Sequence, residues 1–178
     1  MLFRGFSTRN ISLLRHAYIT FIRPILEYAS NVWNPHLLKH VNALERVQRH
    51  FTKRITVLCN LSYGERLACL ELDTLECRRL KANLTLYYKI MHNLTPWPIE
   101  RYFNISVHSR HTRLTASVGD FHISARFCRT VAYQNNCFHR CVSCWNHLPS
   151  TVTSATSSKQ FRNALAHVDL TNYLQYRF

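Results

Sequence analysis

Glycine and acidic residues are scarce in this sequence, and both shortages exclude classes of enzyme. The three glycines, Gly5, Gly64 and Gly119, are too far apart to form a glycine-rich phosphate-binding loop. Only three aspartates occur and none is adjacent to another, whereas two-metal nucleotidyl transfer needs carboxylates gathered around the metal ions. The sequence also has no nucleophile elbow of a hydrolase. We therefore expect no catalytic site and no cofactor in this chain.

Long apolar segments are missing as well. No run of about 18 apolar residues could span a membrane, and the first residues lack the apolar core of a secretory signal. The seven cysteines are an odd number, which does not favour a disulfide framework. We expect reduced thiols and an intracellular protein, cytoplasmic or nuclear, that is neither secreted nor bound to a membrane.

Positive charge, in contrast, is abundant. The 178 residues include 23 Lys and Arg against 9 Asp and Glu, so the formal net charge is +14, and 47% of the residues are hydrophobic. This hydrophobic content is too high for a disordered basic tail. The composition predicts a folded protein with a basic surface and an acidic partner, of which nucleic acid is the first candidate.

The first half of the sequence has the apolar spacing of helices. Apolar residues recur at steps of three and four from Ile11, and Pro24 inside this pattern predicts a kink or break near Arg23. A second helix is expected from about Pro35 to about Leu58.

Two further helix starts can be recognised from their capping residues. Ser62 and Glu65 fit a capping box before a short helix that ends near Leu70. Thr74 fits the N-cap of a longer helix that runs to about Asn93.

The helical pattern stops at Pro96 and Pro98, and the rest is less regular. Alternation around residues 121–125 is compatible with a short β-hairpin, although its turn signal is weak. A helical segment near residues 138–146, a Ser/Thr-rich loop and a final helix through Phe161, Leu165 and Val168 should follow. The predicted fold class is mainly α: about four helices in residues 1–95, then a less regular extension in residues 96–178.

The predicted second helix is amphipathic and basic. Leu44, Phe51 and Ile55 fall on one side at 100° per residue, and basic residues fall on the other. Such a basic face is often only a solvated surface, but the large net charge and a second basic cluster on the next long helix favour contacts with phosphates. The candidate nucleic-acid-binding residues are Lys39, Arg46, Arg49, Lys53, Arg78, Arg79 and Lys81.

A cluster of possible zinc ligands lies near the end of the chain. Cys137, Cys141, Cys144 and His147 have side chains that can hold zinc tetrahedrally. Structural zinc sites usually split their ligands into two separated pairs, whereas these four crowd into one short stretch. Free cysteines also pack as small apolar side chains, and we prefer that interpretation, which predicts no metal at this position.

Short phrases recur in a fixed order along most of the chain. They are FIRPILEYAS at 21–30, ERVQR at 45–49, FTKRI at 51–55, SY at 62–63, LE at 75–76, RR at 78–79, YKI at 88–90, WN at 145–146 and LP at 148–149. As an ordered set, across roughly residues 2–168, they resemble the C-terminal part of the reverse transcriptases of jockey-like, LINE-type non-long-terminal-repeat retrotransposons.

This resemblance implies a thumb-like helical region followed by a C-terminal extension of an RNA-directed DNA polymerase. The family's catalytic aspartates lie upstream of the matching region, so no residue here takes their role, and Mg²⁺ would belong to that upstream palm. The implied function is a non-catalytic fragment of a transposable element, with basic helices that contact the backbone of an RNA or DNA duplex. Three alternatives remain open: a stand-alone helical nucleic-acid-binding protein, a zinc-stabilised interaction module, and a pseudogene product without function.

Overall fold

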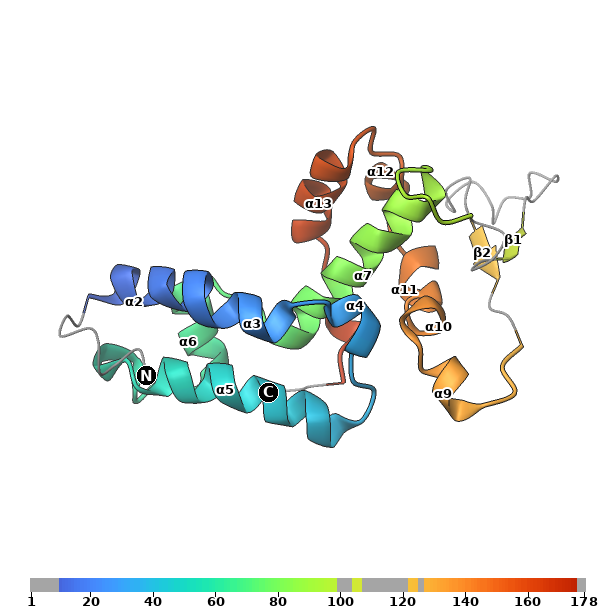
Figure 1. Cartoon of the computed structure of the whole chain (residues 1–178). Helices are drawn as coiled ribbons and strands as arrows, with labels where there is room; N and C mark the ends of the chain where they lie inside the picture. Colours follow the sequence, from blue (N-terminus) through green and yellow to red (C-terminus); the bar gives the residue numbers. More distant parts are fainter. Residues whose placement is uncertain (1–9, 99–103, 107–121, 125–126, 176–178) are drawn as a thin grey trace. The chain divides into compact units, whose positions relative to one another are not determined.

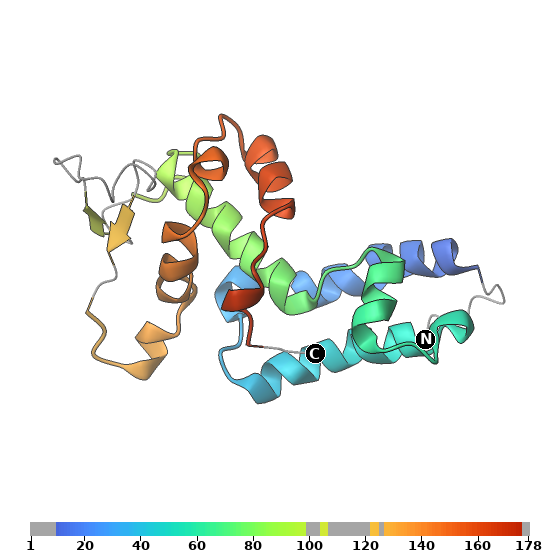
Figure 2. The same ribbon diagram turned by 180° about the vertical axis from the view of Figure 1, so that it is seen from behind.

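The computed structural model describes residues 10–98, 104–106, 122–124 and 127–175, and it confirms the mainly α fold class (Figures 1 and 2). Two compact units are present. The N-terminal unit comprises Met1–Arg79 and Leu174–Phe178, and the C-terminal unit comprises Leu80–Tyr173. The predicted boundary after residue 95 falls inside the C-terminal unit, because the later turns of the long helix α7 supply apolar residues to that unit's core.

The first helix of the N-terminal unit is interrupted next to its proline. Helix α2 (Ile11–Ala17) passes through a π-helical turn, η1 (Tyr18–Ile22), into α3 (Arg23–Glu27). Pro24 has no backbone N–H, and its ring crowds the carbonyl four residues earlier. The break predicted near Arg23 therefore takes the form of a widened turn, in which the Arg23 N–H donates to the Tyr18 carbonyl.

A short helix that the sequence did not predict comes next. Ala29 has φ 49°, and this left-handed residue leads from α3 into α4 (Ser30–Trp33). Helix α5 (Leu38–Lys53) then has 16 residues, and a 3₁₀ turn, η2 (Thr56–Leu58), follows it. The helix is thus shorter at both ends than the predicted range from Pro35 to Leu58.

Helix α6 (Tyr63–Leu70) has the capping box predicted from the sequence. The Glu65 N–H donates to the Ser62 hydroxyl over 3.4 Å, and the Ser62 N–H donates to the Glu65 carboxylate over 2.7 Å. Two of the backbone donors that a helix start leaves unpaired are thereby satisfied. The cap fixes where α6 begins.

Helix α7 (Leu75–Met91) begins at the predicted N-cap. The Thr74 hydroxyl accepts from the Cys77 N–H over 3.1 Å. Asn93, with φ 52°, lies just past the last turn in the left-handed conformation that commonly ends helices. The sequence thus predicted both ends of α7 to within about two residues.

The core of the N-terminal unit lies where α2, α5 and α6 meet. Helices α2 and α3 run alongside α5 in both views, with α6 across them (Figures 1 and 2). The Tyr18 and Phe51 rings stack at 4.7 Å between α5 and the first helix. The buried cluster consists of Leu14, Tyr18, Phe51, Ile55, Leu58, Tyr63, Leu67, Leu70 and Leu72.

The C-terminal unit consists of short elements packed around the later part of α7. They are the strands β1 (Asn104–Ser106) and β2 (His122–Ser124), the helices α9 (Val131–Gln134), α10 (Cys137–Arg140), α11 (Val142–Asn146), α12 (Ser150–Thr153) and α13 (Ser158–Ala166), and the 3₁₀ turn η4 (Thr171–Tyr173). Helix α12 occupies part of the predicted Ser/Thr-rich loop, and α13 is the predicted final helix.

The two strands pair antiparallel, with Ile105 opposite Ile123. Strand β2 falls within the predicted alternating stretch. Its partner β1 lies further upstream than the strand that a turn at Gly119 would pair with β2. The side-chain amide of Asn146 on α11 also binds the backbone of β2. It accepts from the Ile123 N–H over 3.0 Å and donates to the Ile123 carbonyl over 2.8 Å. The amide satisfies the Ile123 N–H and carbonyl as a neighbouring strand would, and it connects β2 to the helical part of the unit.

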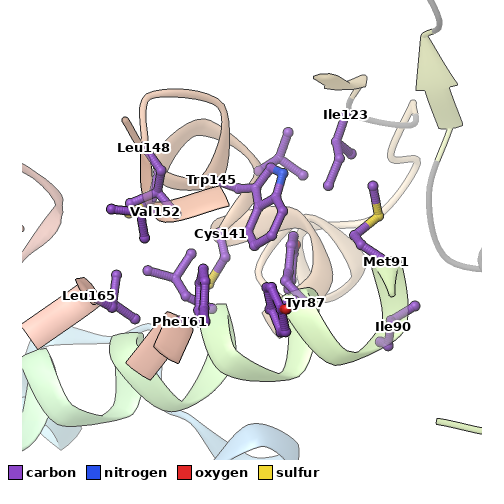
Figure 3. Packing of buried hydrophobic residues seen from close by; sticks show 14 of the residues in the cluster. Tyr87, Ile90, Met91, Ile123, Cys141, Trp145, Leu148, Val152, Phe161 and Leu165 are labelled. Atoms are coloured by element: carbon purple, nitrogen blue, oxygen red, sulfur yellow. The ribbon is translucent and has the colours of Figure 1, made fainter. Parts of the chain in front are cut away.

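Aromatic side chains fill the core of the C-terminal unit (Figure 3). The Phe161 ring of α13 stacks on Tyr88 of α7 at 4.5 Å and lies 6.0 Å from the Trp145 ring of α11. The Tyr88 hydroxyl donates to the Ala155 carbonyl over 2.6 Å, so this buried polar group has a partner. Three helices and the segment after α12 are thereby fixed against one another.

Candidate nucleic-acid interface

The predicted basic side chains of α5 all lie on its exposed face. Lys39, Arg46, Arg49 and Lys53 are exposed. They fall within about 80° around the helix axis and span about 21 Å along it, at 1.5 Å and 100° per residue. We call these four residues the basic stripe. Its length matches about six base-pair steps along the axis of a duplex.

The opposite face of α5 fixes the orientation of the basic stripe. Val41, Glu45, Gln48, Phe51 and Thr52 are buried. The helix cannot rotate about its axis without exposing these side chains, so the stripe faces outward because of packing.

Three of these buried residues are polar, which the helical periodicity did not predict. The Tyr18 hydroxyl donates to Gln48 Oε1 over 2.6 Å, and Gln48 Nε2 donates to the Asp73 carbonyl over 3.0 Å. Thr52 Oγ1 accepts from Arg66 Nε over 3.2 Å. A signal was present in the sequence, because at 100° per residue Gln48 falls within the apolar arc and Thr52 falls at its edge.

Glu45 is the buried carboxylate of this network. Its Oε1 accepts from the Tyr63 hydroxyl over 2.6 Å, and its Oε2 accepts from the Leu75 N–H over 3.1 Å. The carboxylate therefore lies at the first turn of α7, where negative charge is favourable. It connects α5 to the starts of both α6 and α7.

Burial controls the protonation of this network. It raises the pKa of Glu45 above its ordinary value, although the Tyr63 hydroxyl and the Arg79 charge oppose the shift. Burial, followed by the nearby Glu45 charge, also raises the pKa of the Tyr63 phenol. Tyr63 thus stays protonated and can act as the donor in the pair.

Arg49 differs from the other members of the basic stripe. Its guanidinium lies 5.0 Å from the centre of the Tyr63 ring, and the Arg66 guanidinium lies 5.6 Å from the same ring. These are cation–π distances. Arg49 is therefore partly held by Tyr63, the first residue of α6.

Arg78 and Arg79 of the second predicted basic cluster make contacts within the N-terminal unit. Arg78 Nη2 donates to Glu27 Oε2 over 3.0 Å. Arg79 is buried, and its Nε donates to Asn34 Oδ1 over 3.1 Å. Lys81 is half-buried on the part of α7 that belongs to the C-terminal unit. We leave these three residues out of the interface, because two are engaged with α3 and the segment after α4 and the third belongs to the other unit.

The zinc candidates whose side chains the structure describes do not gather around one point. Cys141 and Cys144 are buried in the core of the C-terminal unit, whereas His147 is exposed and its Nδ1 lies 2.6 Å from the Ser143 carbonyl. The Cys137 side chain is outside the described part of the structure. Among the described side chains, no three His, Cys, Asp or Glu are placed to hold a metal ion. Packing is the role that the structure gives to Cys141 and Cys144.

No helix in the described ranges is both long and apolar enough to cross a membrane. Comparison with family models gave no match, and no solved structure matches the chain. An uncharacterized protein of Caenorhabditis elegans is 29% identical over 93 residues, which cover 51% of this chain and 47% of the relative. The chain thus aligns with about half the length of the curated relative that it matches.

Proposed function

We propose that this chain is a non-catalytic, C-terminal part of a retrotransposon reverse transcriptase and that its basic stripe contacts the phosphate backbone of an RNA or DNA duplex. The ordered phrases of the sequence support the family, and the exposed basic stripe on α5 carries the binding role. The proposed role is binding and not chemistry, since the residues that resemble the family lie downstream of its catalytic aspartates.

The charges on α5 support this proposal more strongly than net charge alone. Glu45 is the single acidic residue of α5; its side chain is buried, although it lies one turn before Arg49 on the same side of the helix. The basic stripe therefore carries no exposed carboxylate of its own helix that would neutralise it. Four aligned cations without interleaved acids are what backbone contacts need, because phosphates are recognised by charge without reading the bases.

Binding through the basic stripe predicts a defined salt dependence. If the stripe neutralises about four phosphates, log K should fall with log salt with a slope of roughly −3.6. The double variant Arg46→Glu/Lys53→Glu should weaken binding by about tenfold or more and flatten the slope by about 2. Fluorescence anisotropy with a labelled duplex of about 20 base pairs, titrated at several salt concentrations, measures both quantities.

The matched control lies in the C-terminal unit. Lys159 and Arg162 are exposed basic residues on α13, and Lys159→Glu/Arg162→Glu changes the net charge by the same amount. We expect this control to change the affinity by less than about twofold. Equal losses in the two double variants would show that only the net charge matters and would contradict a role for the basic stripe.

A further inference from the structure

The segment from the end of η1 to the start of α5 exposes large apolar side chains. Val32 is 89% exposed, Tyr28 80% and Ile25 77%. Soluble monomers rarely leave such side chains together on the surface unless the patch is used for binding. The exposed set comprises Phe21, Ile25, Tyr28, Val32, Trp33, Leu37 and Leu38, which we call the apolar patch.

Two aromatic side chains of the apolar patch are held at one corner of the backbone. Tyr28 ends α3, Ala29 turns the chain with φ 49°, and the Trp33 indole N–H donates to the Tyr28 carbonyl over 2.6 Å. Alanine in the left-handed conformation costs energy and has no side-chain hydrogen bond to offset it. Ala29 lies just past the C-cap of α3, where this conformation commonly ends a helix, and it fixes the direction in which the chain continues to Trp33.

The charges around the apolar patch favour a polyanion. Glu27 is the only carboxylate in residues 21–40, and both Arg78 and Arg23 pair with it, the latter at 3.9 Å. Exposed Lys39, at the beginning of the basic stripe, follows Trp33 by six residues. Neither the Tyr28 ring nor the Trp33 ring packs against an aromatic ring of the described residues.

We propose that Tyr28 and Trp33 form a stacking platform for the bases of a single-stranded nucleic acid whose backbone continues along the basic stripe. Exposed aromatic rings beside a track of cations are the usual means of binding single strands, and every base offers a face for stacking. This inference rests on the proposed function and extends it from duplex to single-stranded ligands. It assigns separate residues to the two kinds of contact.

The platform can be tested with Tyr28→Ala and a single-stranded oligothymidylate of about 15 nucleotides. Loss of one stacked base should weaken binding of this probe by about five- to hundredfold, whereas affinity for the duplex should change by less than about twofold. Tyr28→Phe keeps the ring and should bind like the unchanged protein. Because Tyr28 is exposed, the substitution should leave the circular dichroism spectrum unchanged.

Tryptophan fluorescence gives a second readout. The chain has three tryptophans, and Trp145 is only 2% exposed. Replacing Trp97 by Phe therefore leaves Trp33 as the one exposed tryptophan. Oligothymidylate should quench this emission, and a free nucleoside should not.

Two controls separate the possible results. Ile25→Ala removes an equally exposed apolar side chain and should leave oligothymidylate binding unchanged. If Tyr28→Ala has no effect while Arg46→Glu/Lys53→Glu still weakens duplex binding, the platform is wrong and the proposed function stands. If Ile25→Ala and Tyr28→Ala instead reduce self-association of the chain and affect neither nucleic acid, the apolar patch is a protein contact and the platform is overturned.

Discussion

The two units of this protein have different interiors. Polar or charged residues buried in the N-terminal unit are Ser30, Glu45, Gln48, Thr52, Arg66, Thr74, Glu76 and Arg79, whereas Asn83 is the corresponding residue among the described residues of the C-terminal unit. Aromatic and aliphatic side chains fill the C-terminal unit instead. An apolar core accepts many packings of similar volume, whereas each buried donor requires one acceptor in one place. The N-terminal unit should therefore be the more precisely specified of the two.

This difference bears on the proposed interface. Glu45, Gln48 and Thr52 hold the inner face of α5 through partners on η1, α6 and the start of α7. A helix fixed by directional hydrogen bonds presents its outer cations at fixed positions. The network thus provides preorganisation, which reduces the cost of ordering side chains on binding.

The largest expected effect of a single substitution lies in the C-terminal unit. Phe161 is fully buried and stacks on Tyr88, so Phe161→Ala should lower the free energy of unfolding by about 3–5 kcal/mol. Amide hydrogen exchange should show the loss of protection in α13 and α11. Phe161→Leu refills much of the volume and should cost less; an equal loss in both variants would mean that volume does not control the stability of this core.

In the N-terminal unit, we expect Glu45→Ala to have the largest effect among the polar residues. The substitution leaves the Tyr63 hydroxyl and the Leu75 N–H without their acceptor in a buried place, at a cost of about 3 kcal/mol. Loss of exchange protection should appear in α5 and α6. Adding Tyr63→Phe should cost little more, because the shared hydrogen bond is already gone. Additive losses would show that Glu45 and Tyr63 act independently.

The charge of Glu45 makes this effect depend on pH. Burial raises the pKa of Glu45 from its ordinary value of 4.5, so the folded state binds the proton more tightly than the unfolded state. The associated stability is present below pH 4.5 and is lost as the pH rises through the folded pKa. The stability of the unchanged protein relative to Glu45→Gln should therefore fall over this range in chemical denaturation. A relative stability that rises instead would mean that partner interactions outweigh burial.

The sequence predicted local features of the fold better than it predicted the buried network. Caps depend on residues a few positions apart, so Ser62 and Thr74 could be recognised directly. Arg79 was assigned to a basic surface because it clusters with Arg78 and Lys81, whereas its partner Asn34 is 45 residues away in the sequence. Glu45 was given no role, because its partners Tyr63 and Leu75 are also distant in the sequence. Such roles depend on tertiary contacts, which a helical periodicity does not contain.

The smallest expected effects compare matched helix caps in the two units. Ser62 accepts from the Glu65 N–H over 3.4 Å, and Ser157 accepts from the Gln160 N–H over 3.2 Å. The third residue of each helix also accepts a backbone N–H: Glu65 accepts from Ser62 itself, whereas Gln160 Oε1 accepts from Thr156, one residue before the cap, over 3.1 Å. Ser62→Ala and Ser157→Ala should each cost about 1 kcal/mol near neutral pH.

Acid should separate the two caps. The hydrogen bonds with Ser62 hold the pKa of Glu65 below its ordinary value, so the stability from this bonding is lost as the pH falls through the folded pKa. Gln160 does not titrate. The cost of Ser62→Ala should therefore shrink in acid, whereas that of Ser157→Ala should not change, as measured by denaturant unfolding on either side of pH 4.5. Parallel behaviour of the two variants would show that the Glu65 charge contributes nothing to its cap.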